Sequence, residues 1–526
     1  MLKKLLYIFT VVVIIYSCKK ETQQTSDAEK VFSSQVQFYK IPENTLKLLN
    51  DSLQLYYKKN NNEPLWNSFK NRQDLINEIN NCFADGLNPD DYYYEKIKLL
   101  ETNRNQLSEN ELIAYDTLLT SAYKKLATHL YSGKLNPTKL YNDWDLGKKR
   151  IALSDTLINT IVKENIPLSF KNLRPNHSIY IALKKSLALL ESYPNDTFKK
   201  ISIAKKIELN DTVADVISIK KRLRYWNDYT VNDSVYTSVY DSITYLAIKK
   251  FQKRHGLKPD GVIGKGTIEA LNYSKEERKH QIIANLERWK WFPRNFGNEY
   301  VIVNLPDYSL NYVINNDTVS HHTVVVGKKS RRTPILISKI SNLVFNPTWT
   351  VPPTIIKEDL TPAATKNRNY FNRNNMVIIN RSGDTISPAN WNPELAKSYR
   401  YVQRPSANNS LGLVKFNFPN KRLVYLHDTN HRNYFSREDK ALSSGCVRVE
   451  NPFNLAEKIL VQEDKEFWNK ATIDSILIKK KTKSVAIKHA INVYLLYWTS
   501  WSNKDELIFR DDIYALDEKL YKALRN

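Results

Sequence analysis

The sequence predicts a multidomain α+β protein in which a helical domain comes first, a small helical unit follows and a mostly-β domain comes last. Two observations support this prediction. Apolar residues recur at helical spacing over residues 36–205, whereas from about residue 297 they form short alternating or continuous runs typical of strands. The length of 526 residues, of which 42% are hydrophobic, allows three or so domains with cores of their own.

The chain begins with a segment typical of an export signal. Two lysines precede an apolar run, residues 5–16, which is too short to span a bilayer comfortably. The run leads to Ile-Tyr-Ser-Cys18, which resembles the bacterial lipobox, whose cysteine becomes lipidated. We therefore expect residues 1–18 to be a lipoprotein signal peptide with Cys18 as the lipidation site, and an uncleaved membrane anchor is the alternative. The polar residues 19–35 are predicted to form a flexible tether.

Residues 36–205 are predicted to form a helical scaffold domain in which no catalytic motif is visible. Turn signals at residues 85–89 and 132–137 separate the helices. Two apolar stripes mark helix faces, and they comprise Leu46, Leu48, Leu49, Leu53 and Leu55, then Leu112, Leu118, Leu119, Tyr123 and Leu126.

Cysteine usage narrows the candidates for a reactive thiol. The chain has three cysteines, and Cys18 is assigned to lipidation. Cys82 lies in an apolar helical pattern, where a buried and inert thiol is expected. A disulfide between Cys82 and Cys446 is the alternative in an oxidising compartment.

A compact helical unit is predicted over residues 212–272. Apolar positions indicate one helix around residues 219–225 and another around 246–251. The segment from Gln252 to Gly264 contains glycines that allow a tight turn, and Thr267 is placed to open the next helix. This pattern resembles the three-helix peptidoglycan-binding domain, and the resemblance implies binding to glycan strands.

The last domain is predicted to be mostly β over residues 297–480. A polar, irregular stretch at about 354–410, with hints of helix, is predicted to be a capping insertion. Residues 481–526 should add a strand and a terminal helix that pack on the catalytic or the scaffold domain. The strands are expected at residues 300–305, 309–314, 322–326, 343–353, 411–418, 423–426 and 493–499.

Two residues of this domain are suited to acyl transfer. An apolar run delivers His427 at a strand end, and Cys446 follows 19 positions later on a loop before a helix opened by Asn451 and Pro452. A free thiol is mostly protonated at neutral pH, and a neighbouring imidazole can convert it to a thiolate in an ion pair. Gly445 allows a sharp turn there. Backbone N–H groups of Ser444, Gly445 and Cys446 could stabilise an oxyanion.

These residues carry a family resemblance. His427-Asp428-Thr429-Asn430 and Ser443-Ser444-Gly445-Cys446-Val447-Arg448 resemble the signature of L,D-transpeptidases with a YkuD-type catalytic domain. Many relatives have Ser-His-Gly-Cys at this point, so no side-chain role follows for Ser444. The flanking segments 325–334, 346–353, 404–420 and 494–499 are similar to those of the large, multidomain YcbB-like branch.

The resemblance implies a reaction and a set of roles. Cys446 would be the nucleophile and His427 the general base, with a backbone carbonyl orienting the imidazole. Ser444, Gly445, Arg448, Tyr425 and Trp349 are candidates for the oxyanion hole and substrate contacts. The product would be a 3→3 cross-link between peptidoglycan stem peptides, made through a thioester that carbapenems can also form. No cofactor and no metal are implied.

Two alternatives stay open at this point. The same Cys–His pair could pass the acyl group to water, which would make an L,D-carboxypeptidase. The chain could also be a non-catalytic, peptidoglycan-binding envelope lipoprotein. Each places it in the cell envelope, on the periplasmic face, with a lipid anchor in the outer membrane expected. The net charge of +24 suits an anionic wall or membrane surface, and no nucleic-acid motif is visible. The sequence leaves the oligomeric state open.

Overall fold

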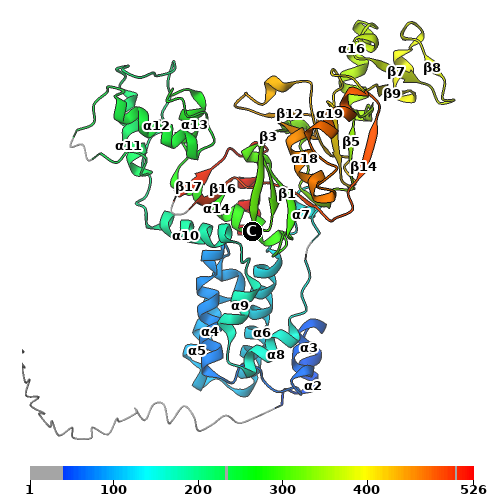
Figure 1. Cartoon of the computed structure of the whole chain (residues 1–526). Coiled ribbons are helices and arrows are strands. Elements are labelled where there is room, and N and C mark those ends of the chain that lie inside the picture. Colours follow the sequence, from blue (N-terminus) through cyan, green and yellow to red (C-terminus); the bar gives the residue numbers. More distant parts are fainter. Residues whose placement is uncertain (1–39, 148, 232–234, 504–505) are drawn as a thin grey trace, which may run out of the picture.

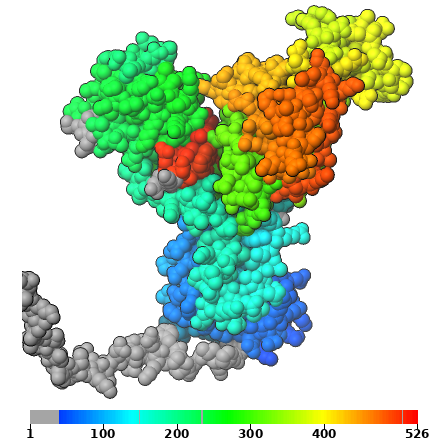
Figure 2. All heavy atoms as spheres, in the orientation of Figure 1, coloured from blue at the N-terminus to red at the C-terminus, as the bar shows by residue number. Residues whose placement is uncertain are grey.

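The computed structural model (Figure 1) describes residues 40–147, 149–231, 235–503 and 506–526 and has the predicted multidomain α+β architecture. The predicted signal peptide, the tether and Cys18 lie outside these residues. In the described ranges, no helix is both long and apolar enough to cross a membrane. A helical stem carries two separate lobes, one formed by the small helical unit and the other by the β domain (Figure 2).

The helical stem is built around a core that includes Leu75, Leu119 and Leu126. The first predicted stripe is partly wrong, because Leu48 is 86% exposed and Leu55 is exposed too. The chain breaks after α2, and Asn50 caps a second short helix by accepting from Leu53 N, so the stripe changes phase. The stem helices are α2 (Glu43–Lys47), α3 (Asp51–Lys59), α4 (Phe69–Asn80), α5 (Tyr94–Thr102), α6 (Glu109–Ser132), α7 (Pro137–Leu140), α8 (Ser154–Val162), α9 (Ile166–Leu173) and α10 (Ser178–Ser192).

The small helical unit contains α11 (Asp215–Tyr225), α12 (Ser242–Arg254) and α13 (Lys265–Leu271) around its own core. Gly261 has a φ of +76°, and its N–H donates to the Gln252 side chain over 2.8 Å. Thr267 does not open the last helix, since Gly264 is the residue before it. Its buried hydroxyl instead accepts from Gln252 Nε2 at 3.2 Å.

The β domain contains an eleven-stranded sheet in the order β14-β5-β10-β11-β13-β3-β2-β1-β15-β4, with β12 paired to β3. Helices α18 (Pro452–Glu463) and α19 (Lys470–Ile478) belong to the same domain. Pro452 begins α18 as predicted, but Asn451 has a φ of +48° and its side chain makes no cap. The strands are β1 (Glu299–Asn304), β2 (Ser309–Ile314), β3 (Asp317–Gly327), β4 (Leu336–Lys339), β5 (Asn342–Phe345), β10 (Val414–Asn417), β11 (Leu426–His427), β12 (Ala441–Ser443), β13 (Val447–Val449), β14 (Lys483–Ala486) and β15 (Asn492–Leu496).

The capping insertion is more regular than the sequence indicated. It forms a four-stranded sheet and has a core of its own, in which Phe371, Trp391 and Tyr401 are fully buried. We call it the cap. Figure 1 shows it projecting from the far end of the β domain. Its elements are β6 (Trp349–Thr350), α15 (Pro353–Ile355), the π-helix η6 (Ile356–Leu360), α16 (Thr361–Lys366), α17 (Tyr370–Arg373), β7 (Met376–Ile379), β8 (Thr385–Ile386) and β9 (Arg400–Gln403).

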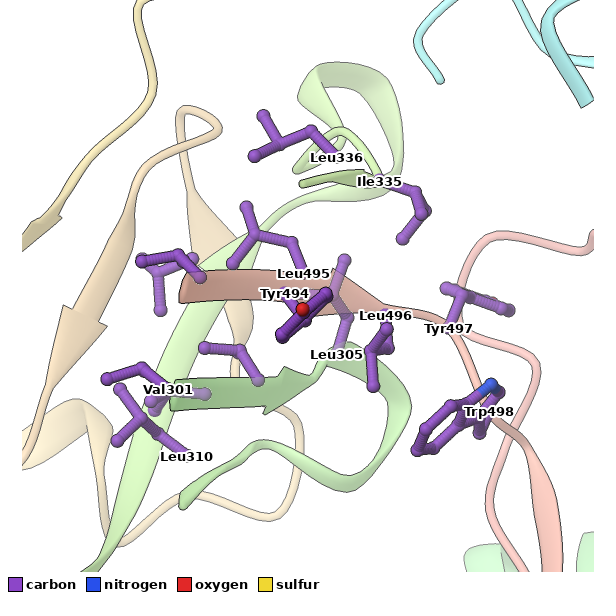
Figure 3. Close-up of a cluster of buried hydrophobic side chains, with 14 of the residues drawn as sticks. Val301, Leu305, Leu310, Ile335, Leu336, Tyr494, Leu495, Leu496, Tyr497 and Trp498 are labelled. Atoms are coloured by element: carbon purple, nitrogen blue, oxygen red, sulfur yellow. The ribbon is translucent and has the colours of Figure 1, made fainter. Parts of the chain in front are cut away.

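The C-terminal segment joins the β domain to the stem. Strand β15 pairs with β1 and β4 inside the sheet, and Figure 3 shows Leu495 opposite Val301 in the shared core. A hairpin, β16 (Ser500–Asn503) and β17 (Glu506–Phe509), follows. The terminal helix α20 (Asp517–Arg525) packs on α14 (Lys275–Trp291), where Asp517 pairs with buried Arg288. Helix α14 is buried on nearly all sides, because the stem and the sheet enclose it.

Candidate active site

Neighbouring strands bring the predicted catalytic residues to one face of the sheet. β11 lies between β10 and β13, and its parallel register with β13 pairs Leu426 with Val447 and His427 with Arg448. Cys446, one position before Val447, therefore lies beside Tyr425. Alternation along strands places all four polar side chains on the same face. Strand spacing puts the Cα atoms of Cys446 and His427 about 8 Å apart, within reach of their side chains.

His427 is held in one orientation by its own chain neighbour. Its Nδ1–H donates to the backbone carbonyl of Asp428, so Nε2 is the basic nitrogen. The ring is only 4% exposed, and burial lowers its pKa to about 3, with the positive charges of Arg448 and Lys415 adding to the effect. The imidazole is thus neutral and able to accept a proton.

The Cys446 thiol is half-buried and free of any disulfide. Burial raises its pKa, while hydrogen bonds from the backbone and hydroxyl of Tyr425, and the charges of Lys415 and Arg448, oppose the rise. Among the described residues, no hydrogen bond joins this sulfur to His427. Both pKa shifts disfavour the resting thiolate–imidazolium pair predicted from the sequence, so that part of the prediction is wrong. Cys82 is a free, fully buried thiol whose pKa is raised by burial, as expected of an inert cysteine.

The turn before the thiol is fixed by a network of short hydrogen bonds. Gly445 has a φ of +119°, a conformation that side-chain-bearing residues rarely adopt. Its carbonyl accepts from Thr333 Oγ1 at 2.8 Å, and its N–H donates to Ser443 Oγ at 3.1 Å. Gly445 is therefore engaged and cannot serve as the predicted oxyanion donor. In the described structure, the N–H groups of Ser444 and Cys446 have no protein acceptor.

Arg448 and Lys415 provide positive charge beside the thiol. Within the described residues, Arg448 Nε and Nη1 are buried without a hydrogen-bond partner, and burial lowers the pKa of the guanidinium. Lys415 pairs in register with His427 across β10 and β11, and its Nζ lies 3.9 Å from the centroid of the Tyr425 ring. Unpaired buried donors of this kind are suited to a ligand carboxylate.

The remaining predicted residues lie around the thiol. The Tyr425 hydroxyl contacts Cys446 and Trp349, and Trp349 belongs to the cap core. Ser444 is exposed, and its hydroxyl accepts from Arg331 Nη1 at 2.9 Å. The side chain of Ser444 therefore points to the cap side and away from an oxyanion role.

Three further residues escaped the sequence-based search. Arg331 joins Ser444 to the cap residues Glu358 and Asp359, with Nη1 2.6 Å from Asp359 Oδ2. Thr333 supports Gly445, and Lys415 faces His427. Lys415 and Thr333 lie inside the resembling segments, but only the strand register reveals what they contact.

The described residues contain no group of three or more His, Cys, Asp or Glu side chains placed to hold a metal ion. The arrangement joins a thiol, a neutral imidazole, free backbone donors and unpaired cationic donors. This set is suited to nucleophilic acyl transfer on a substrate that carries a carboxylate.

Comparison with known proteins agrees with this arrangement. Residues 298–473 match the family model described as "L,D-transpeptidase catalytic domain". Residues 51–187 match "Scaffold domain", and residues 212–271 match "Putative peptidoglycan binding domain". A curated protein of Haemophilus influenzae named "Putative L,D-transpeptidase" is 37% identical over 253 residues, which are 48% of this chain and 51% of that protein. The match thus spans about half the length of the relative.

Two solved structures are similar at low identity. An L,D-transpeptidase from Stackebrandtia nassauensis is 15% identical over 57% of this chain and 97% of that chain, with a TM-score of 0.22. An L,D-transpeptidase from Xylanimonas cellulosilytica is 14% identical over 56% and 100%, with a TM-score of 0.18. At these TM-scores neither likeness enters the argument below.

The β domain is therefore an L,D-transpeptidase catalytic domain of the YkuD type. The chain as a whole is a multidomain protein that combines this domain with a scaffold domain and a peptidoglycan-binding domain.

Proposed function

We propose that the protein is a peptidoglycan L,D-transpeptidase that forms 3→3 cross-links between stem peptides through a thioester on Cys446. The observation that carries this proposal is the shared sheet face of Cys446, neutral His427 and the unpaired donors of Arg448, inside a domain that matches L,D-transpeptidase catalytic domains. The match to a peptidoglycan-binding domain supports the same substrate.

The first half-reaction forms the thioester. The Cys446 sulfur attacks the carbonyl that links the third residue of a tetrapeptide stem to its terminal D-alanine, while His427 Nε2 takes the thiol proton. The N–H groups of Ser444 and Cys446 stabilise the oxyanion, each typically worth about 3–4 kcal/mol. The C–N bond then breaks, and the imidazolium returns its proton to the amine of the departing D-alanine.

The second half-reaction transfers the acyl group. The side-chain amine of a third residue on a neighbouring stem attacks the thioester and gives a proton to His427. The new amide forms as the C–S bond breaks, and Cys446 recovers its proton. Tyr425, between the thiol and Trp349 of the cap, helps to enclose this step. Exclusion of water favours an amine acceptor over hydrolysis.

We further propose that the protein works in the cell envelope, lipid-anchored through Cys18 at the outer membrane and facing the periplasm. The export-signal pattern of residues 1–18 and the basic charge of the chain support this location.

Intact-mass spectrometry with a carbapenem tests the nucleophile. The wild-type chain should gain one covalent adduct, and Cys446→Ala should gain none. Cys82→Ala is the matched control and should react like wild type, because Cys82 is fully buried. Equal labelling of wild type and Cys446→Ala would remove Cys446 from its proposed role.

Product analysis with purified tetrapeptide stems separates the proposed reaction from its alternatives. Cross-linked dimers with released D-alanine are expected from wild type. Tripeptide without dimer would identify a carboxypeptidase instead. Intact tetrapeptide together with an unreactive Cys446 would leave a non-catalytic, peptidoglycan-binding protein.

A further inference from the structure

A long groove lies where the catalytic domain, the stem and the C-terminal hairpin meet, away from Cys446. A cavity of about 600 Å³ has the outer face of β1 and β2 among its walls, together with the first residues of α10 and Trp501 of β16. A second cavity of about 310 Å³ shares His177, Phe296, Tyr300 and Asn316 with it, so the two form one elongated groove. Figure 2 shows the hairpin, coloured red, at the foot of the hollow between the two lobes.

Aromatic rings are concentrated along this groove. Trp289 and Trp498 stack with ring centroids 4.0 Å apart, and His177 stacks on Phe296 at 4.8 Å. Figure 3 shows Trp498 beyond the end of β15, apart from the aliphatic cluster around Val301. In the described structure, the indole N–H groups of Trp289 and Trp498 have no acceptor. Buried donors of this kind are rare, and water or a ligand commonly completes them.

The polar lining of the larger cavity is nearly neutral. It consists mainly of amides and hydroxyls, including Asn304, Asn311 and Ser309. Asp307 is its charged residue, and Arg510 Nε pairs with that carboxylate at 2.5 Å. Desolvation lowers the pKa of His177, which therefore stays neutral. A stem peptide, which carries carboxylates and an amine, finds no opposite charges here.

The sheet also offers no free edge for a peptide. β1 is paired on both sides, with β15 and β2, and β2 is paired with β1 and β3. An extended peptide therefore cannot add itself as a strand. Aromatic faces beside neutral amides and hydroxyls instead suit the apolar faces and the hydroxyl and acetamide groups of sugar rings.

The groove is also continuous with the module that matches a peptidoglycan-binding domain. The hairpin that supplies Trp501 contacts this module, because Arg510 Nη1 donates to the Arg254 carbonyl at 3.2 Å and Arg254 Nη1 donates to the Leu507 carbonyl at 3.4 Å. A polymer bound to one site can therefore extend towards the other.

We propose that this groove binds a neutral β-linked N-acetylhexosamine chain, a second glycan site outside the peptidoglycan-binding domain. That this chain is a peptidoglycan strand rests on the proposed function. The groove would hold a glycan strand on the catalytic domain itself while stem peptides react at Cys446.

Photo-cross-linking with a β-1,4-linked N-acetylglucosamine hexamer that carries a photoreactive group tests this proposal on the full chain. Mass spectrometry should find cross-links within residues 298–318 and 498–503. Trp501→Ala should reduce them about tenfold or more, since aromatic anchors dominate many binding sites. Ile302→Arg, which fills the groove floor with a long cationic side chain, should reduce them as well. Phe467→Ala, at an exposed aromatic outside the groove, should leave them unchanged.

Three results would overturn the proposal. The hexamer could cross-link solely within residues 212–271, it could label the groove equally in both groove variants, or free tetrapeptide could compete better than unlabelled hexamer. The groove variants should still convert soluble stem peptides at the wild-type rate. Failure of turnover in wild type would therefore count against the proposed function alone, and failure of groove labelling against the groove alone.

Discussion

At the reacting thiol, burial raises the pKa of Cys446 and lowers that of His427 to about 3, so both groups are neutral between these values. Iodoacetamide, which reacts with thiolate, should therefore label Cys446 at a rate that rises about tenfold per pH unit up to and beyond pH ~8.5, the ordinary thiol value. Mass spectrometry of the adduct at a series of pH values measures this rate, with Cys446→Ala as the blank. A plateau reached below pH 7 would instead show a resting ion pair.

Arg448 offers a second prediction at the scale of one residue. Its unpaired Nε and Nη1 lie on the face of Cys446, and we assign them to a substrate carboxylate. Arg448→Gln should raise KM for a tetrapeptide stem by about 10- to 100-fold, because a charged hydrogen bond contributes about 1.5–3 kcal/mol. The change in kcat should be smaller. The mutant should fold as stably as wild type, since no protein partner loses a contact to these two atoms.

A matched substrate keeps that prediction specific. A stem peptide whose terminal carboxylate is amidated should bind wild type and Arg448→Gln alike. An equal loss with both substrates would assign Arg448 to bracing the loop rather than to the carboxylate.

At the scale of elements, the cap is joined to the thiol loop by Arg331. Its guanidinium contacts Glu358 and Asp359 on η6 and the hydroxyl of Ser444. Arg331→Ala should loosen the cap and raise the ratio of hydrolysed to cross-linked product several-fold. Chromatography of both products measures this ratio. The free energy of unfolding should change by less than about 1 kcal/mol, because the acidic partners are exposed.

The adjacent residue provides the control. Arg332 pairs with Asp143 of the stem at 3.0 Å and not with the cap. Arg332→Ala removes the same charge and should leave the product ratio at the wild-type value. If both substitutions shift the ratio equally, charge near the loop matters and the contact with the cap does not.

Local pattern predicted some elements well and others poorly. β1, β2 and β3 were predicted from their runs of Val, Ile and Leu, which fit a buried sheet. The cap strands were missed, because β6 and β8 have two residues each and polar segments surround them. The hairpin β16–β17 was missed for a similar reason, since Ser and Asn residues interrupt its apolar pattern.

The candidate site was predicted in its motif but not in its environment. The motif identifies Cys446 and His427 as neighbours, whereas their pKa shifts depend on burial by distant segments. Lys415 reaches the site through the register of β10 with β11, and Arg331 reaches Ser444 across 113 positions. Contacts of this kind follow from tertiary packing and leave no periodic signal in the sequence.

For the whole molecule, one chain of contacts runs from the stem to the turn before Cys446. Arg288 of α14 pairs with Asp517, which follows the C-terminal segment that contains Tyr514. The Tyr514 hydroxyl donates to the Gly327 carbonyl at 2.7 Å and accepts from Thr333 N at 3.2 Å. Thr333 Oγ1 in turn donates to the Gly445 carbonyl at 2.8 Å. The last residues of the sequence thus help to set the position of the nucleophile loop.

Tyr514→Phe tests whether this chain of contacts serves catalysis. Loss of the hydroxyl leaves Gly327 O and Thr333 N without their partner and should lower the free energy of unfolding by about 1–3 kcal/mol. It should also lower kcat for thioester formation with little change in KM, because Thr333 no longer holds Gly445 firmly. Tyr312→Phe is the matched control, since it removes a buried hydroxyl that bonds Glu299 away from the loop. Both variants should lose similar stability in denaturant unfolding, but only Tyr514→Phe should slow acylation by a carbapenem. Thr333→Val should slow it too, and the double mutant should lose less than the sum of the two effects, because both residues act through one contact. Equal acylation rates in Tyr514→Phe and Tyr312→Phe would show that the C-terminal segment stabilises the fold without positioning Cys446.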